Sequence, residues 1–406
     1  MPLATSSRAQ LRIIKESVYG VTPVAGNGRK LRMTGESLNF DLSKEESKEI
    51  RSDRQISGAV TVDANAAGGF NFHQQYAEYD PLIEGAMAST WSAYGVNGVG
   101  TTFSGTVAVG SITAAVAPTT TSAFTNLALG QWFKYTAPGD VANDGKFFKV
   151  HSVTAPTSTV ITLDASTPGV AAGPTAGSFV STSRISNGVL ESSFTIEKEF
   201  ADVTQFLTFR GMTVAKMNIN FASAALTDGS FEFMGKDVIR MAATQMPGTT
   251  AESQAYDIQN GVRGVGTIWL GTVPLTGTFI KSLSLSTDNT LRGRKALANL
   301  GNVSIGYGDF KASGQMEIYF ADGTQYDRFL NDTYAALVLS CTDSSKNGYV
   351  FTMPRTLLMN GKVTAGAKNQ DIMATFDFTA FADDANAVVA LRKTLFIDRV
   401  GPAVVP

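Results

Sequence analysis

The chain has 406 residues, with 33 Lys and Arg against 35 Asp and Glu, which gives a formal net charge of −2. This length favours two or three domains, and the balanced charge argues against a protein that reads nucleic-acid sequence. The single cysteine, Cys341, excludes an intrachain disulfide framework and is expected to be a small buried apolar residue.

Short segments of alternating apolar and polar residues recur along the chain and predict a mainly β protein. They are "SLNFDL", "MNINFAS", "SFEFMG", "SLSLST", "MEIYF" and "MATFDFTA", each bounded by turn-forming residues. The N-terminal sequence has no apolar run behind a basic start, and no window is apolar over the length of a membrane helix. We therefore expect synthesis and assembly in the host cytoplasm, without membrane insertion.

Two short segments have the pattern of helix starts. In "YDPLIEGAM", Asp80 is predicted to cap the helix and Pro81 to occupy its first turn, and the following residues form one apolar stripe. In "YDRFLNDTY", Asp327 is the equivalent predicted cap. We expect one short helix in each half of the chain.

These helices belong to a longer parallel between the two halves. Ser37-Leu38 precedes Ala67-Gly68-Gly69, and Ser282-Leu283 precedes Ala312-Ser313-Gly314, with the same serine-to-glycine spacing (37 to 69 and 282 to 314). A Tyr-Asp helix start follows in both halves, and "FEF" at 231–233 corresponds to "FDF" at 376–378. The conserved order of landmarks predicts an internal duplication; chance similarity of two β-rich halves is the alternative.

A segment poor in charge and rich in Thr, Ala, Gly and Ser separates these landmarks in the first half only. It contains strand-like stretches such as "TFSGTVAV" and "KFFKVHSV", so we expect a small folded β domain. The predicted organisation is a discontinuous first domain at 1–91 and 187–245, an inserted β domain at 92–186, and a second domain at 246–406. The two repeated domains are expected to be tandem β-sandwiches.

Residues that carry catalysis are scarce. His73 and His151 are the only histidines, and neither lies in a pattern of metal ligands. The chain contains no nucleophile-elbow or phosphate-loop motif. We predict no catalytic residue, metal site or cofactor, and an enzyme is the least favoured reading.

Two charged segments, one in each half, follow an alternating strand and are predicted to be long loops. Such loops are usually functional in a compact domain, although a solvated hairpin loop is the plain alternative. Mixed charge suits docking to another copy of the chain. The predicted inter-subunit contacts are Lys44, Glu45, Glu46, Lys48, Glu49, Arg51, Asp53 and Arg54 in the first loop, and Asn289, Arg292, Arg294 and Lys295 in the second.

Several stretches together resemble the major tail tube proteins of long, non-contractile-tailed phages. They include "IIKESVYGVTP", "ESLNFDLSKEESKEIRSDRQISGAVTVDANAAGGFNFHQQYAEYDPLIEGAM", "LGQWFKYT" with "NGVLESSFTIEKEF", and "SLSLSTDNTLRGRKALANLGNVSIGYGDFKASGQMEIYF". The similarity lies in pattern and order over nearly the whole chain. It implies a structural virion protein located in the tail.

The resemblance also implies how such a chain works. Four strands of each tube domain contribute to a barrel around a channel, and rings stack through long loops, which match 41–58 and 286–301 here. The channel holds the tape-measure protein and passes genomic DNA. Two tube domains per chain predict a homotrimeric ring with pseudo-sixfold symmetry; without a duplication, a homohexameric ring is expected.

Two other classes of protein are compatible with this sequence. A contractile-tail or secretion-system tube can share the fold, although such chains tend to have a single tube domain. An adhesive or carbohydrate-binding β protein would expose aromatic residues on the inserted domain, where Trp132 and Phe133 are candidates; we expect both to be buried.

Overall fold

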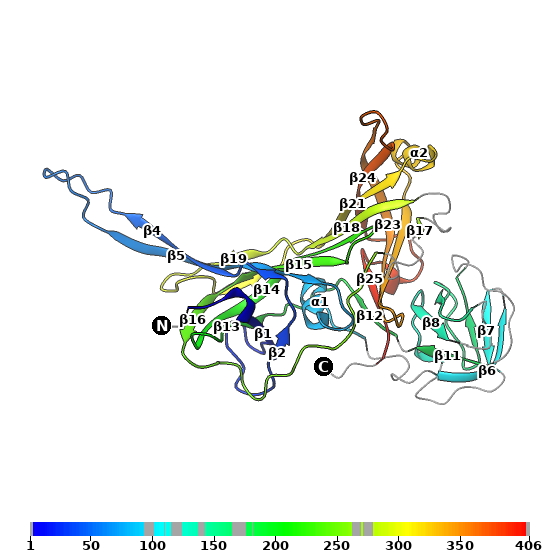
Figure 1. Cartoon of the computed structure of the whole chain (residues 1–406), viewed down its shortest axis with the longest axis horizontal. Coiled ribbons are helices and arrows are strands. Elements are labelled where there is room, and N and C mark those ends of the chain that lie inside the picture. The colour runs from blue at the N-terminus through cyan, green and yellow to red at the C-terminus, as the bar shows by residue number, and fades with distance from the viewer. Residues whose placement is uncertain are drawn as a thin grey trace.

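The chain is mainly β, as predicted, and its strands form one extended network and one separate domain (Figure 1). The computed structural model describes residues 3–92, 101–108, 110–114, 124–136, 143–164, 176–180, 182–261, 269–270 and 279–402. The α-helices of this part are α1 (Asp80–Met87) and α2 (Thr324–Leu330), one in each half. Short 3-10 turns lie at Ser6–Arg8, Phe124–Asn126 and Val389–Leu391.

Eight antiparallel strands form a central sheet that runs through both halves. Their order is β4-β5-β15-β14-β18-β21-β24-β23. The bounds are β4 (Asn39–Glu46), β5 (Ala59–His73), β15 (Asp228–Gly235), β14 (Gln205–Ala222), β18 (Ile280–Asp288), β21 (Lys311–Tyr319), β24 (Met373–Phe381) and β23 (Gly348–Thr364).

The first four strands of this sheet and the last four have the same arrangement. Each set begins with two paired strands, β4 and β5 or β18 and β21. It ends with two paired strands that are consecutive in the chain, β15 and β14 or β24 and β23. The helix of each half contacts the long strand of its own set, α1 with β14 and α2 with β23. Pairing of β14 with β18 joins the two sets into one sheet.

The strand register shows which residues of the two halves are equivalent. Gly68 lies opposite Phe233, and Gly314 lies opposite Phe378 in the second half. Gly68, and not Gly69, therefore corresponds to Gly314, and Ser37 corresponds to Ser284, so the alignment made from spacing is one residue out at the glycine and two at the serine. The difference matters because side chains alternate between the faces of a sheet, and a shift of one residue exchanges them.

Each half also has a flanking sheet that shares its long strand with the central sheet. The first has the order β2 (Arg29–Leu31), β1 (Ala9–Lys15), β13 (Phe194–Phe200), β14 and β16 (Asp237–Met241). The second has the order β17 (Trp269–Leu270), β22 (Ala335–Thr342), β23, β25 (Phe396–Val400) and β12 (Thr182–Ser186). Thus β12, within the segment expected to form the insert, pairs with the second half.

One apolar core spans both halves, between the central sheet, the flanking sheets and the helices. Phe70 and Phe231 face each other across neighbouring strands of the first half, and Met316 and Phe376 do so in the second. All four side chains are buried. Alternation places the apolar residues of each central strand on this one face, as is typical of a sandwich.

Asp80 does not cap helix α1, contrary to the sequence prediction. The residue before the helix is Tyr79, and no side chain caps the helix start by a hydrogen bond. The buried Asp80 carboxylate instead accepts a hydrogen bond from Tyr349 Oη at 2.6 Å and forms an ion pair with Arg399. A partner from the second half therefore determines the role of this carboxylate, and spacing within the first half could not reveal it.

The predicted cap at Asp327 is also wrong, because α2 begins three residues earlier. Asp322 Oδ1 accepts a hydrogen bond from the backbone N–H of Thr324 at 2.9 Å, at the start of the helix. Asp327 lies within α2 and is exposed. The Tyr-Asp pairs of the two halves therefore occupy different positions in their helices.

The inserted domain is a six-stranded sheet with its own apolar core. Its order is β10 (Val160–Thr162), β7 (Ser111–Ala114), β6 (Thr101–Ala108), β11 (Ala176–Val180), β8 (Trp132–Thr136) and β9 (Phe147–Lys149). It lies at the opposite end of the molecule from the β4–β5 hairpin (Figure 1). Three short strands complete the fold: β3 (Gly35–Glu36), β19 (Arg292–Arg294) and β20 (Ser304–Gly306).

Candidate assembly surfaces

Strands β4 and β5 continue beyond the central sheet as a projecting hairpin, which we call the arm (residues 40–65). Strand β15 ends opposite Ala66, whereas β4 and β5 remain paired to Glu46 and Ala59. Figure 1 shows the arm extending far from the body of the molecule. The predicted loop at 41–58 is therefore partly wrong, because residues 41–46 are strand and only 47–58 form the tip.

The predicted contact residues of the first loop all lie on the arm. Its tip is held by local hydrogen bonds: Arg51 Nε donates to Asp53 Oδ1 at 2.9 Å, and Ser57 Oγ donates to Glu49 Oε2 at 2.6 Å. The Arg51 hydrogen bond lowers the pKa of Asp53 below its usual value. Three predicted residues are on strand β4 and five are in the tip: Lys44, Glu45 and Glu46, then Lys48, Glu49, Arg51, Asp53 and Arg54.

The arm also carries exposed apolar side chains that the sequence analysis did not single out. They lie on both strands and at the tip: Leu42, Ile50, Ile56, Val60 and Val62. Clustered exposed apolar residues are typical of surfaces that become covered by another protein. The alternating pattern of β5 contained this signal, because its apolar residues continue beyond the last residue paired with β15.

The corresponding segment of the second half folds back onto the first half. Asn289 was predicted to contact another subunit, but only 3% of its surface is exposed. Its Nδ2 donates to the carbonyl oxygens of Ala86 at 3.1 Å and Val214 at 3.0 Å, which lie in α1 and β14. Asn289 is therefore a contact between the two halves of one chain.

The basic residues of this segment divide in the same way. Lys295 forms an ion pair with Asp63 on β5, and Asn302 Nδ2 donates to the carbonyl oxygen of Gly235 at 2.9 Å. Arg292 and Arg294 lie on the small β19–β20 hairpin and are exposed. Of the four residues predicted in the second loop, these two arginines are the ones left on the surface without an ion pair among the described residues.

The second face of the central sheet, opposite the core, is mainly polar, with exposed apolar residues such as Met359 and Phe381 near the β23 edge. Residues directly opposite each other on neighbouring strands share a face, and here they are mostly Asn, Ser, Thr and Gln. Asn218 Nδ2 donates to Ser230 Oγ at 3.1 Å across one strand pair. Gln315 and Asn360 both donate to Asp377, and these hydrogen bonds lower the pKa of its carboxyl.

Acidic side chains outnumber basic ones on this polar face. Lys216 lies 4.0 Å from Glu232 and 3.9 Å from Asp288, so it is shared between two carboxylates. A net negative, hydrogen-bonded surface repels a polyanion and offers phosphate no fixed cationic site. The charged residues of the face are Asp41, Glu46, Asp63, Asp228, Glu232, Asp288, Glu317 and Asp377, against Lys44, Lys216, Lys311, Arg355 and Lys362.

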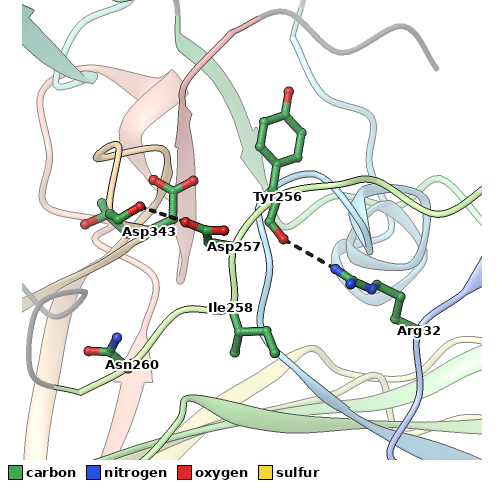
Figure 2. A pocket seen from close by; sticks show the side chains of 8 residues that line it. Arg32, Tyr256, Asp257, Ile258, Asn260 and Asp343 are labelled. Atoms are coloured by element: carbon green, nitrogen blue, oxygen red, sulfur yellow. Dashed lines mark hydrogen bonds between the residues drawn. The ribbon is translucent and has the colours of Figure 1, made fainter.

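The cavity drawn in Figure 2 shows no catalytic constellation among the described residues. It has a volume of about 440 Å³ and lies between the segment 256–260 and the turn after β22. Ser344 Oγ donates to Asp257 at 2.7 Å, and Arg32 Nη1 donates to the carbonyl oxygen of Tyr256 at 3.3 Å. In the part of the chain that the structure describes, no three His, Cys, Asp or Glu side chains are grouped as metal ligands.

A sequence-family model described as phage tail tube protein matches residues 6–380. The chain belongs to the phage tail tube protein family. No curated protein matches it in sequence. The match covers both halves and the inserted domain, and it confirms the resemblance to tail tube proteins that the sequence analysis found.

Membership of the tail tube family establishes the general role of the chain. It is a structural component of the virion tail, not an enzyme, and it assembles with copies of itself into a tube. Within the described residues, neither α1 nor α2 has the length and apolar character needed to cross a membrane.

The inserted domain of this tail tube protein buries the aromatic residues that an adhesive module would expose. Phe133 is in the core of the insert, and Trp132 packs against the second half beside Val350 and Val400. Their burial is as predicted. Arg184 strengthens the same contact, because its guanidinium forms an ion pair with Asp398 at 2.7 Å and donates to carbonyl oxygens of the insert.

Proposed function

We propose that three chains form a ring with pseudo-sixfold symmetry, and that stacked rings make the tail tube. The observation that carries this proposal is the repetition of one four-stranded arrangement twice along a single sheet. Two equivalent units per chain turn three chains into six positions. Closure into a ring also removes the exposed sheet edges, which are otherwise sites of uncontrolled association.

In this ring the polar face of the central sheet lines the channel. Three chains with eight central strands each supply about 24 strands, and strands spaced about 4.8 Å apart and tilted about 40° give a backbone diameter of about 48 Å. Such a barrel is wide enough for a DNA duplex. The excess of carboxylates over lysines on the polar face lets DNA slide through and also leaves room for the tape-measure protein before ejection.

The arm supplies the contact between stacked rings. It projects beyond the central sheet by about seven residues of paired strand, or about 23 Å. Its exposed apolar side chains toward the tip, Ile50, Ile56, Val60 and Val62, are then covered by the next ring, as are its charged residues, among them Lys44 and Lys48. The exposed Arg292 and Arg294 lie on the corresponding segment of the second half and face the same junction.

Electron microscopy of the purified protein at increasing concentration tests the proposed function. We expect hollow tubes built from rings, with three chains in each ring and the inserted domain repeated three times around the outside. Six chains per ring would contradict the trimeric ring but would still support the formation of a tube. A protein that stays monomeric at every concentration, and also when tail-tip complexes are added as initiators, would contradict self-assembly.

Deletion of residues 44–54 separates the stacking contact from folding. Because the arm lies outside the apolar core, the shortened chain is expected to remain folded and soluble, with unchanged circular dichroism. It should form no tubes. Tubes of normal length from this variant would refute the role assigned to the arm.

A further inference from the structure

The junction between the two halves shows how one tube unit joins the next. At this junction β14 and β18 are antiparallel, with Asn218 opposite Ser286 and Ile219 opposite Leu285. The ladder is formed by residues of β14 and β18 alone, from Lys216 opposite Asp288 to Ala222 opposite Ser282. The same geometry can therefore form between separate chains.

The strand register identifies the residues that would repeat this pairing. Asn218 faces Ser230 of β15, as Lys362 faces Thr375 of β24, so Lys362 occupies the position of Asn218. By the same comparison through β5 and β21, Asn39 occupies the position of Ser286. The equivalents of β14 and β18 at the two edges of the central sheet are thus β23 and β4.

The outer edges of these two strands are open. Among the described residues, β4 pairs only with β5, and from Leu357 onward β23 pairs only with β24. We propose that the ring closes by antiparallel pairing of β23 of one chain with β4 of the next, with Lys362 opposite Asn39 and Val363 opposite Leu38. This inference rests on the proposed ring and specifies its interface.

Side chains around the two edges complement each other in this register. Lys362 would lie diagonally across from Asp41 on the polar face, and the internal junction also joins a lysine to an aspartate there, Lys216 and Asp288, which are directly opposite at 3.9 Å. Leu42 takes the position of Asn289, which covers the end of α1. In the ring Leu42 covers the end of α2, where Leu330 is 60% exposed and Leu42 itself is 48% exposed.

One ion pair must leave the edge of β4 before the strands can pair. Ser37 bonds to Gly69 of β5, so the N–H and carbonyl groups of Leu38 point toward the open edge. The N–H of Leu38 donates to Glu36 Oε2 at 3.0 Å, and Lys198 Nζ donates to its carbonyl oxygen at 3.3 Å. Glu36 and Lys198 are themselves paired at 2.8 Å, and together they cap the edge of the free subunit.

Engineered disulfides test the register. Asn39→Cys combined with Lys362→Cys is expected to give covalent dimers and trimers when assembled tubes are oxidised, because directly opposed residues are close enough for a disulfide. Asn39→Cys combined with Thr364→Cys is the matched control, two residues out of register, and should cross-link at least tenfold less. The native Cys341 is buried and does not interfere.

The outcomes distinguish the interface from the tube itself. Tubes in which the control pair cross-links as well as the first pair would overturn the register, and tubes without any cross-link would overturn the β23–β4 pairing. Failure of the unmodified chain to form tubes would instead contradict the proposed function. If the cysteine variants do not assemble, a carbodiimide that condenses lysines with carboxylates is applied to unmodified tubes; Lys362 joined to Asp41 of another chain is expected, and its absence would refute the pairing.

A separate experiment tests whether Glu36 and Lys198, which cap the backbone of Leu38, restrain assembly. Lys198→Met removes the donor to the Leu38 carbonyl, and hydrogen bonds to charged groups are strong enough that the concentration for half-maximal assembly should fall about tenfold. Lys15→Met, which removes a more exposed ion pair with Glu84 beside the same sheet, is the control and should leave this concentration unchanged. An unchanged concentration for Lys198→Met would show that the pair does not restrain assembly.

Discussion

Helices α1 and α2 occupy equivalent places, yet their surroundings differ. Six of the eight residues of α1 are buried, whereas Gln325 is the only buried residue of α2. The second half of the chain covers α1 through Asn289 and through partners of Asp80. No comparable segment covers α2 within the described residues, and the proposed ring would supply that cover from another chain.

The two charged segments differ for the same reason. The second segment, 289–303, lies against β5 and β15 of its own chain, through Lys295 and Asn302. The arm instead projects beyond the central sheet, because β4 and β5 remain paired past the end of β15. Segments at corresponding places in the two halves therefore have different surroundings.

Substitution of Asp80 should have the largest effect on the difference between the surroundings of α1 and α2. Asp80→Ala leaves the buried Arg399 without its carboxylate partner, and loss of one member of a buried ion pair should lower the free energy of unfolding by about 3–5 kcal/mol. Burial already lowers the pKa of Arg399 to about 10, so the guanidinium still carries its charge at neutral pH. Urea unfolding followed by fluorescence provides the measurement.

Asp327→Ala is the matched control, because Asp327 lies in the exposed helix α2. Its effect on the free energy of unfolding should stay within about 0.5 kcal/mol. Equal effects of the two substitutions would show that α1 and α2 are supported alike and would remove the basis of the comparison.

Substitutions of Asn289 and Leu42 also test whether a helix is covered within one chain or by another chain, and we expect smaller changes in stability from them than from Asp80→Ala. Asn289→Ala leaves buried carbonyl oxygens of α1 and β14 without a donor and should cost about 2–3 kcal/mol in urea unfolding of the monomer. Leu42→Ala should leave monomer stability unchanged, because the side chain is half exposed, and should instead weaken tube formation seen by light scattering. A large loss of monomer stability for Leu42→Ala would mean that its position is already covered within one chain.

Periodicity was sufficient for the fold class, because alternation depends only on which face of a strand is buried. The strands around Phe231 and Phe376 show this, since both were predicted from their alternating pattern. The one-residue error at Gly69 arose because spacing along the chain does not record register. Bulges in β4, β14 and β23 shift the register without changing the pattern.

The candidate site was less predictable, because its residues acquire their roles from distant partners. Charge identified the arm, but it did not distinguish Asn289, which is buried by α1, from Arg292, which is exposed. The roles of Asp80 and of Lys198 depend on Arg399 and Leu38, each far away in sequence. The polar face could be found only after the register had shown which residues lie opposite one another.

The smallest effect is expected where the second segment meets the arm. Lys295 lowers the pKa of the Asp63 carboxyl, so this pair stabilises the folded chain at pH values above the ordinary carboxyl range. The stabilisation is lost as the pH falls through the lowered pKa of Asp63. Lys295→Met should therefore reduce stability slightly at neutral pH, and the difference should shrink as the pH falls below about 4 and vanish once Asp63 is protonated even in the paired state.

Thermal unfolding of both chains between pH 3 and pH 7 measures this difference. Lys311→Met is the control, since Lys311 is an exposed lysine of the second half and forms no ion pair among the described residues. High salt should also diminish the effect of Lys295→Met, because the pair is exposed and screened. A difference between parent and variant that does not shrink between pH 7 and pH 3 would mean that Lys295 stabilises the segment through its packing and not through Asp63, and the return of this segment onto the first half would then need another cause.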